Sequence, residues 1–196
     1  MDIQSNWEEY KAHLYATERE GVDELIKWME KTDAPTAPAS TKYHLCVKGG
    51  LIKHSLNTLN FAREINELLG TKIPEESLVL ATLLHDLCKV NYYVEGEEWD
   101  KEHKDKTGQW RKMACWKIED KLPLGHGEKS VIIANRYITL TGPEMLAIRW
   151  HMLKWDVSVE AQRTMGIATD KDPLVKITAM ADQMAELYET LPNKDS

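Results

Sequence analysis

The fold is decided by one apolar stretch, Leu78-Val79-Leu80-Ala81-Thr82-Leu83-Leu84-His85-Asp86-Leu87-Cys88-Lys89. Pro74, followed by Glu75 and Glu76, predicts a helix start just before it. Proline suits the first turn of a helix, and acidic side chains suit the positive end of its dipole. We expect this helix to run to about Val90. Apolar residues cover most of its circumference, so the pattern predicts a central and deeply buried helix.

Helical spacing of apolar residues also predicts helices before this one. Ser5 and Glu8 have the spacing of a capping box, which would open a first helix. A short second helix is predicted by Val22, Leu25, Ile26 and Met29. Residues 33–40 contain two prolines, so we expect an extended connector between an N-terminal arm, residues 1–40, and the main body. A further helix is predicted from Leu51, with Gly70 able to end it in a left-handed conformation.

The second half of the chain begins with a change of pattern. Residues 91–122 set tryptophans and tyrosines among charges, with a turn at Thr107-Gly108, which predicts an inserted β-hairpin. Helical spacing returns over 127–140. The segment Thr141-Gly142-Pro143-Glu144 then predicts the end of that helix and the start of another, which carries Met145, Ile148 and Trp155. The last predicted helix opens at Asp172-Pro173. Together the patterns predict an all-α helical bundle with a small hairpin insertion at about 91–122.

Composition sets limits on the class of protein. The chain has 196 residues, 42% of them hydrophobic and 29% charged, which fits a single globular domain over 1–196. No apolar run approaches the ~20 residues that span a bilayer, and the N-terminus does not resemble a signal peptide, so we expect a cytoplasmic protein without a membrane partner. The net charge of -7 leaves no basic stripe for an extended duplex nucleic acid. A small anionic substrate remains compatible with this charge.

The cysteines agree with a reducing compartment. Cys46, Cys88 and Cys115 are odd in number and widely spaced. This spacing favours reduced thiols over a disulfide framework and gives no indication of a cysteine-based zinc site.

The dipeptide His85-Asp86 is the main candidate for chemistry. A buried unpaired carboxylate is costly, so it becomes neutral, pairs with a cation or coordinates a metal. A buried hydrogen-bonded His-Asp pair, or a partly exposed pair, is the alternative interpretation. Further polar candidates lie in apolar surroundings at His54, Asp182, His126 and His151. Each of them alone is compatible with packing or capping, but ligand-type side chains from four helices around one central helix favour a metal site.

The order His54, His85-Asp86, Asp182 resembles the H…HD…D signature of the HD phosphohydrolase superfamily. Several segments resemble the HD module of bacterial 3'-5' exoribonucleases, namely His44 to Ser55, Leu83 to Lys89, Leu124-Gly125-His126-Gly127 and Arg149-Trp150-His151. The resemblance covers about residues 43–190. It does not extend to the OB-fold domain that precedes the module in those enzymes, because the 40 residues of the N-terminal arm are too few to form one. The hairpin insertion is a second difference from those enzymes.

The resemblance implies a ligand set and a cofactor. In that family the four core residues hold one metal, and two extra histidines, matched here by His126 and His151, hold a second one that the central Asp86 bridges. A loop position or a capping role is the alternative for His126. Four imidazoles and two carboxylates favour one or two ions of Mn, Fe, Ni, Co or Zn over Mg.

Lys89 follows Asp86 by one turn. The resemblance implies that it contacts a substrate phosphate or orders the nucleophilic water, and a surface lysine at a helix end is the alternative. Weaker candidates, each compatible with a surface or supporting role, are His44, Lys48, Lys53, Glu128 and Arg149.

These observations predict a metal-dependent phosphohydrolase or phosphodiesterase that cleaves a nucleotide or short oligonucleotide with a metal-activated water. Asp86 would orient the water, and Lys89 would offset developing charge. Two other classes remain open, an HD-type diiron oxygenase and a non-catalytic nucleotide-binding module. The tryptophans of the insertion, Trp99, Trp110 and Trp116, are expected either to pack the hairpin onto the helices or, for at least one of them, to stack on a nucleobase.

Overall fold

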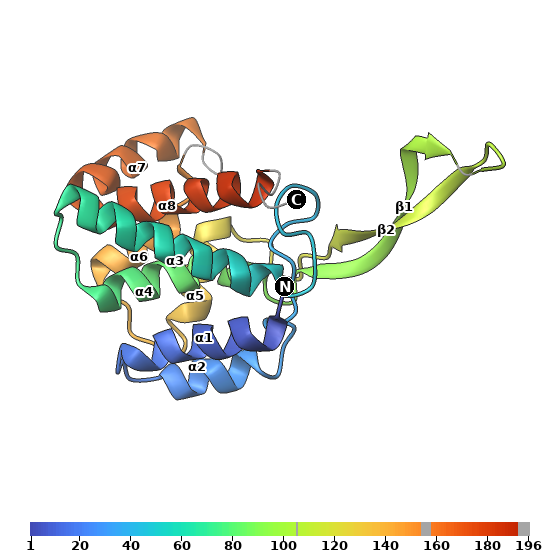
Figure 1. Ribbon diagram of the computed structural model, residues 1–196. Coiled ribbons are helices and arrows are strands. Elements are labelled where there is room, and N and C mark those ends of the chain that lie inside the picture. The colour runs from blue at the N-terminus through green and yellow to red at the C-terminus, as the bar shows by residue number, and fades with distance from the viewer. Residues whose placement is uncertain (105, 154–157, 192–196) are drawn as a thin grey trace.

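A computed structural model describes residues 1–104, 106–153 and 158–191 of the chain. Its helices gather into one bundle, and its two strands project from one end of that bundle (Figure 1). The helices are α1 (Ile3–Ala16), α2 (Val22–Met29), α3 (Gly50–Leu69), α4 (Glu75–Leu84), the short 3₁₀ helix η1 (Leu87–Lys89), α5 (His126–Ala134), α6 (Gly142–Trp150), α7 (Val159–Lys171) and α8 (Pro173–Thr190). The strands are β1 (Tyr93–Lys104) and β2 (Trp110–Ile118). The predicted helical bundle with an inserted hairpin is confirmed.

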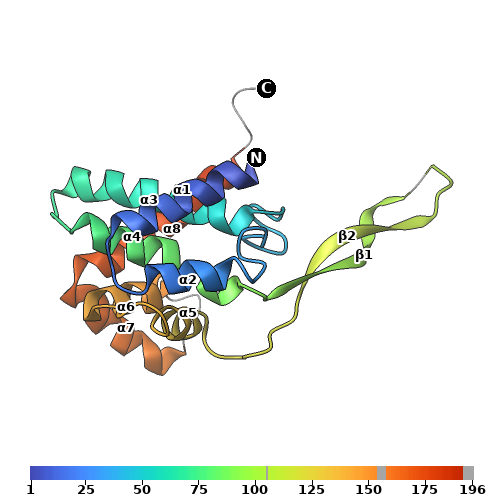
Figure 2. The same cartoon turned by 90° about the horizontal axis from the view of Figure 1, so that it is seen from below.

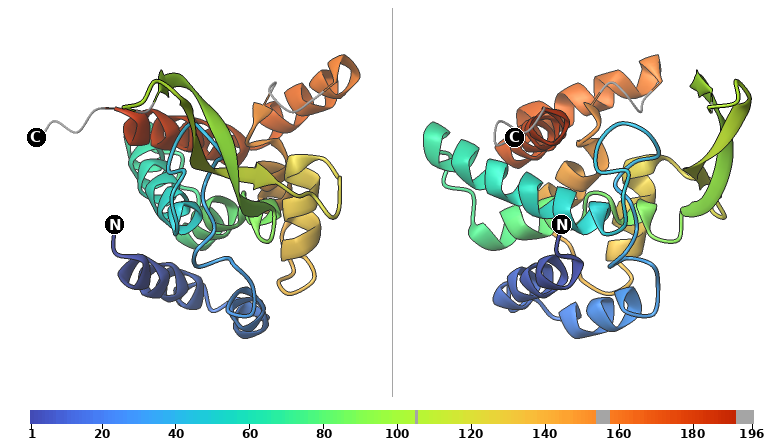
Figure 3. Two further views of the ribbon diagram at one scale, coloured as in Figure 1. Left: turned by 90° about the vertical axis from the view of Figure 1, so that its right-hand side faces the viewer. Right: turned by 45° about the vertical axis from the view of Figure 1, so that its right-hand side comes forward.

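Helix α4 is the centre of the bundle, as its sequence predicts. It contacts α1, α3, α5, α6 and α8, and every residue from Leu78 to Leu84 is buried. Helices α1 and α2 cover one side of the bundle, and α7 lies on the opposite side (Figures 1 and 3). The hydroxyl of Tyr10 donates a hydrogen bond to the carbonyl of Leu83 at 2.7 Å, so this buried polar group is paired.

The helix that precedes the His85-Asp86 pair ends earlier than predicted. α4 ends at Leu84, His85 is its C-cap, and the chain turns at Asp86 into η1. The prediction of a helix to Val90 was wrong. The last carbonyls of a helix have no backbone partner, and His85 Nδ1 lies 2.6 Å from one of them, that of Thr82. The spacing of hydrophobic residues cannot predict this hydrogen bond, which accompanies the end of the helix at His85-Asp86.

Two predictions for the N-terminal arm were also wrong. Asp2, rather than Ser5, caps α1 by accepting the Ser5 backbone N–H at 3.0 Å, so Ser5 lies inside the helix. The segment 33–40 is not extended, because the backbone N–H groups of Thr36 and Ala37 both donate to the carbonyl of Asp33. Buried alanines at 34, 37 and 39 pack this turn on the core. The small alanine side chains let this segment approach the core closely, which the two prolines alone do not predict.

Other helix boundaries agree with the sequence. Gly70 ends α3 in a left-handed conformation with φ of 62°. Thr141 and Glu144 form a reciprocal capping box at the start of α6. Asp172 caps α8 by accepting a backbone N–H, and Pro173 occupies its first turn.

The region after the hairpin differs from the prediction at three points. α5 ends at Ala134, because the Asn135 side chain accepts the Leu140 backbone N–H at 3.1 Å and closes a turn. α6 ends at Trp150, and Trp155 lies outside the described residues. α7 was not predicted. Few of its side chains are buried, with Met165 and Ala168 among them, so its sequence carries little hydrophobic periodicity.

The hairpin is an antiparallel ladder that extends away from the bundle (Figure 2). Pairing runs from Tyr93 opposite Ile118 to Trp99 opposite Lys112, and the register then shifts before the turn. Near its base, Trp116 Nε1 donates to the carbonyl of Cys46 at 3.0 Å. None of the described helices has the length and hydropathy needed to cross a bilayer.

Candidate metal centre

The structure brings all six predicted ligands together inside the bundle. α3 contributes His54, the end of α4 contributes His85 and Asp86, the first residue of α5 is His126, the C-cap of α6 is His151, and α8 contributes Asp182. Five of them are at most 5% exposed, and the side chain of His126 is 23% exposed. Segments that are far apart in the sequence therefore converge on one buried point.

Asp86 stands in the middle of this cluster. Its Oδ2 lies 3.3 Å from His85 Nε2 and 3.9 Å from His54 Nε2. Its Oδ1 lies 2.7 Å from His126 Nε2 and 3.8 Å from His151 Nε2. One oxygen thus faces the histidines of the four-residue signature, and the other faces the two additional histidines.

Asp182 completes the set from α8. Its Oδ1 lies 2.9 Å from His54 Nε2 and 3.6 Å from His85 Nε2. Four groups of potential ligands overlap here, and within each group the ligand atoms lie within 4.8 Å of one another. The groups are His54, His85 and Asp86; His85, His151 and Asp182; Asp86, Cys88 and His126; and His44, His54 and Glu189. The shared members join these groups into one continuous cluster.

Two of the histidines are held by the backbone of their own helix. Each is a helix C-cap, and its Nδ1 lies next to a carbonyl three residues earlier, at 2.6 Å for His85 and 2.7 Å for His151. A carbonyl only accepts, so Nδ1 carries the hydrogen and Nε2 faces the cluster. Both Nε2 atoms are buried and lack a hydrogen-bond partner within the described part of the chain.

The carboxylates determine the protonation of the cluster. Burial lowers the pKa of His54, but Asp182 and Glu189 outweigh it and raise that pKa to about 9. Burial of His126 is likewise outweighed, chiefly by Cys88 and Asp86, which raise its pKa to about 10. Burial lowers the pKa of His151 to about 3, and the neighbouring His85 acts in the same direction.

The carboxylates themselves stay charged despite burial. Burial raises the pKa of Asp86, but Lys89 and His85 outweigh it and hold that pKa well below its usual range. The pKa of Asp182 is held down in the same way by its hydrogen bond to His54 and by the nearby His85. Two buried anions among imidazoles form a site that attracts cations.

The residues fit a divalent metal. Buried polar atoms in folded proteins normally have partners, yet the Nε2 atoms of His85 and His151 point without one toward two buried carboxylates. Imidazole nitrogens and carboxylate oxygens together are typical ligands of first-row transition metals. A cation at this point would satisfy the unpaired nitrogens and the anions at the same time.

Lys89 lies at the edge of the cluster. Its Nζ is 2.6 Å from Asp86 Oδ2, and its side chain is 12% exposed. Burial lowers the pKa of Lys89, but Asp86 outweighs it and raises that pKa above its usual value. Lys89 therefore contacts Asp86, as its position one turn later suggests, although η1 rather than an α-helix places it there.

Two neighbours of the cluster were missed from the sequence. Cys88 Sγ lies 3.3 Å from His126 Nδ1, and Glu189 Oε2 lies 3.0 Å from His54 Nδ1. A signal existed for Glu189, because it follows Asp182 by seven residues and so shares its face of α8. Cys88 is a free thiol, as are Cys46 and Cys115.

The weaker candidates divide into two groups. His44 is buried, and its ring centroid lies 4.7 Å from that of His54. Lys48 instead pairs with Glu95 of the hairpin at 2.8 Å. Glu128 and Arg149 pair with each other. Lys53 is half-buried on α3. Only His44 of this group is in direct ring contact with a predicted ligand.

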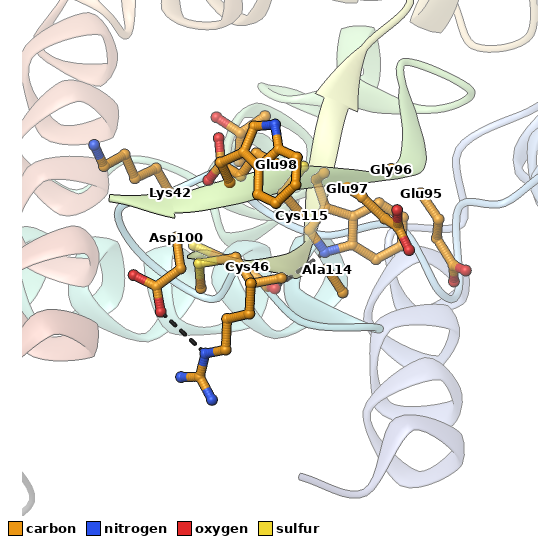
Figure 4. A pocket seen from close by; sticks show the side chains of 14 residues that line it. Lys42, Cys46, Glu95, Gly96, Glu97, Glu98, Asp100, Ala114 and Cys115 are labelled. Carbon is orange, nitrogen blue, oxygen red and sulfur yellow. Dashed lines mark hydrogen bonds and ion pairs between the residues drawn. The ribbon is translucent and has the colours of Figure 1, made fainter. Parts of the chain in front are cut away.

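A separate pocket lies between the hairpin and the loop at residues 41–46 (Figure 4). It has a volume of about 1160 Å³, and none of the six predicted ligands lines it. Trp99 and Trp116 contribute aromatic surface, while Glu95, Glu97, Glu98 and Asp100 make much of its wall acidic. Arg111 pairs with Asp100 at 3.3 Å inside it. This pocket is therefore distinct from the histidine and aspartate cluster.

Comparison with known proteins is consistent with this arrangement. The HD domain family matches residues 51–187, so the chain belongs to the HD domain family. A dihydroneopterin 2',3'-cyclic phosphate phosphodiesterase from Methanocaldococcus jannaschii is 32% identical over 73 residues, which cover 35% of this chain and 29% of that relative. The chain thus spans less than a third of the length of this curated relative. No solved structure matches this chain.

Proposed function

We propose that this protein is a metal-dependent phosphohydrolase that cleaves a phosphate ester of a nucleotide or short oligonucleotide. One observation carries the proposal. The unpaired Nε2 atoms of His85 and His151 converge with the buried oxygens of Asp86 and Asp182, and all four residues lie within the segment 51–187 that matches the HD domain family. The six ligands we propose are His54, His85, Asp86, His126, His151 and Asp182.

The substrate class that we propose is supported by the net charge of the protein and by the relative. The relative is named for a 2',3'-cyclic phosphate, so we propose a phosphodiester within one small nucleotide-like molecule as the first class to test. The overall charge of -7 disfavours a long nucleic acid. A local cation can hold a phosphate whatever the net charge of the protein.

Each polar residue then has a role in hydrolysis. A bound divalent metal would supply Lewis acidity, which lowers the pKa of water toward neutrality and withdraws charge from phosphoryl oxygens. Asp86, with its two oxygens facing different histidines, orients the attacking water. Lys89 holds Asp86 through its ammonium group and offsets negative charge that develops on the phosphoryl group. The ester P–O bond breaks as the water oxygen bonds to phosphorus, and the proton that the water loses passes to the leaving oxygen.

The metal we propose is Mn, Fe, Ni, Co or Zn, in one or two ions. Four imidazoles with two carboxylates favour these over Mg. If two ions are bound, Asp86 would be a ligand of both, because each of its oxygens faces a different set of histidines. We also propose that residues 1–196 form one HD unit and that it acts in the cytoplasm, which the three free thiols support.

A metal-by-substrate screen tests the function. The purified protein would be loaded with each metal and assayed for phosphate ester cleavage on 2',3'-cyclic nucleotides, nucleoside mono-, di- and triphosphates, cyclic dinucleotides and short RNA. We expect turnover of a small phosphodiester that a chelator abolishes and that does not need oxygen. Oxygen consumption with iron and no ester cleavage would instead favour a diiron oxygenase. Absence of turnover with every metal would favour a non-catalytic binding module.

A further inference from the structure

Glu189 places a buried carboxylate behind one of the proposed ligands. It lies in the last turn of α8, and its side chain is only 2% exposed. Its Oε2 and Oε1 lie 3.0 and 3.3 Å from His54 Nδ1. Oε1 also accepts a hydrogen bond from Asn57 Nδ2 at 2.7 Å. Asn57 follows His54 by one helical turn on α3, so the two donors hold the carboxylate between them.

The hydrogen bond fixes which nitrogen of His54 faces the cluster. A carboxylate accepts, so His54 Nδ1 donates to Glu189. Nε2 is left on the opposite edge of the ring, where it lies 2.9 Å from Asp182 Oδ1. Glu189 therefore holds the orientation of the imidazole and keeps a hydrogen on Nδ1. The hydrogen that Nε2 of the protonated imidazole directs at Asp182 is the one that a metal would replace.

The position of His54 in its helix explains why a carboxylate is needed. His85 and His151 are helix C-caps, so each finds a carbonyl in the final turn of its own helix. His54 instead lies in the second turn of the 20-residue helix α3. Carbonyls of the preceding turn are already bonded there to backbone N–H groups. The acceptor for His54 Nδ1 must come from another element, and α8 supplies it.

We propose that Glu189, anchored by Asn57, is a positioning residue that holds His54 with Nε2 directed at the metal. This inference rests on the function proposed above. A carboxylate that accepts from a ligating histidine fixes its tautomer and makes it a stronger donor, and loss of such a partner typically weakens metal binding by about 10- to 100-fold. Glu189 thereby links the C-terminal turn of α8 to the affinity of the metal centre.

Zinc affinity measured by competition with a chelator tests this role. We expect Glu189→Gln, which keeps the shape and removes the charge, to weaken zinc binding by about 10-fold, and Glu189→Ala to weaken it by up to about 100-fold. Glu186→Gln is the matched control on the same helix, because its carboxylate is 45% exposed and faces His44 at 3.5 Å rather than His54. We expect that control to change the affinity by less than about threefold, since exposed charges are screened.

The second measurement is the position of the hydrogen on the His54 ring, which the loss of a purely structural contact would not change. In zinc-loaded protein, long-range ¹H–¹⁵N spectra report which nitrogen of His54 carries the hydrogen. We expect Nδ1–H and a metal-bound Nε2 in the parent, and altered His54 nitrogen shifts in Glu189→Gln but not in Glu186→Gln. Circular dichroism checks that each variant is folded, and Asn57→Ala gives an independent variant if Glu189→Ala does not fold.

The outcomes separate the two proposals. A parent that binds no metal overturns the proposed function and the positioning role together. A parent that binds zinc, with folded Glu189→Gln binding it equally tightly, overturns the positioning role alone. Zinc bound to His54 Nδ1 would also overturn it.

Discussion

The hairpin lies in sequence between two members of the ligand cluster, Asp86 and His126, but the two regions have opposite physical characters. In the cluster, side chains from five helical elements meet in the interior, and five of the six proposed ligands are at most 5% exposed. In the hairpin, Trp99, Trp110 and Met113 are 58%, 51% and 46% exposed. The cluster depends on the whole bundle, whereas the strands pair mainly with each other. A substitution in the cluster should therefore affect metal binding and hydrolysis. A substitution in the hairpin should affect only which substrates are hydrolysed.

The two regions meet at the base of the hairpin. Tyr93 begins β1 four residues after Lys89 and is half-buried. Burial raises the pKa of its hydroxyl, while the nearby Lys89 acts in the opposite direction. Farther along, Trp116 is anchored on the carbonyl of Cys46, so the packing role expected for one tryptophan applies to it. Lys112 and Lys104 lie over the exposed rings of Trp99 and Trp110.

The largest effect is expected for Asp86→Ala in the cluster. The carboxylate contacts both sets of histidines, so its loss should remove metal retention and reduce hydrolysis by at least about 1,000-fold. Elemental analysis and the turnover assay measure these effects, with circular dichroism to show that helix content is kept. A folded Asp86→Ala protein with undiminished metal would place the site elsewhere.

A smaller effect is expected for the two histidines that face Asp86 Oδ1, and it distinguishes a one-metal from a two-metal site. We expect either His126→Ala or His151→Ala to lower the stoichiometry from about two metals to about one, because these histidines face only Oδ1. His13→Ala on α1 is a matched control, since that histidine is partly exposed beside Glu9. One metal per chain in the parent and in both variants would assign the two histidines to the substrate or to support of the other ligands.

The cluster should also make the protein sensitive to pH. Folding raises the pKa of His54 to about 9 and of His126 to about 10, so their protonated forms favour the folded state. That stabilisation is complete below the unfolded pKa of about 6.5 and is lost as the pH rises through the folded values. The free energy of unfolding of metal-free protein should thus fall above about pH 6.5.

Metal binding should show the opposite trend, because the metal displaces those protons. We expect zinc affinity to increase from pH 6.5 to about 9, with proton release measurable by calorimetry in buffers of different ionisation enthalpy. A variant with a shortened hairpin should show the same pH dependence. A metal-free protein whose stability does not change over this range would contradict the proposed coupling.

The smallest effect is expected for the hairpin. Replacing residues 97–114 with Asn-Gly would remove Trp99 and Trp110 but keep Trp116 and the base of the ladder. If an outer tryptophan stacks on a nucleobase, KM for a nucleotide should rise by about fivefold, which corresponds to ~1 kcal/mol of stacking. KM for a simple aryl phosphate should not change. Equal losses on both substrates would leave the hairpin as a cover for the bundle.

The sequence by itself determined much of the fold. The apolar content of Leu78 to Leu84 predicted the central helix, and local signals such as Gly70, the Thr141-Glu144 box and Asp172-Pro173 predicted boundaries that the structure confirms. The hairpin was predicted from its alternation of aromatic and charged residues around a turn. These signals are local, because caps, turns and hydrophobic periodicity act within a few residues.

Only the tertiary structure decided how the proposed site is built. Hydrophobic spacing placed His85 and Asp86 within a helix, but a hydrogen bond to the Thr82 carbonyl places them at its end. Cys88 beside His126, and Glu189 behind His54 across 135 residues of sequence, depend on how separate helices pack. α7 carried too few buried residues to be recognised. A sequence pattern records which residues avoid water, whereas the convergence of their polar atoms is set by the packing of the whole bundle.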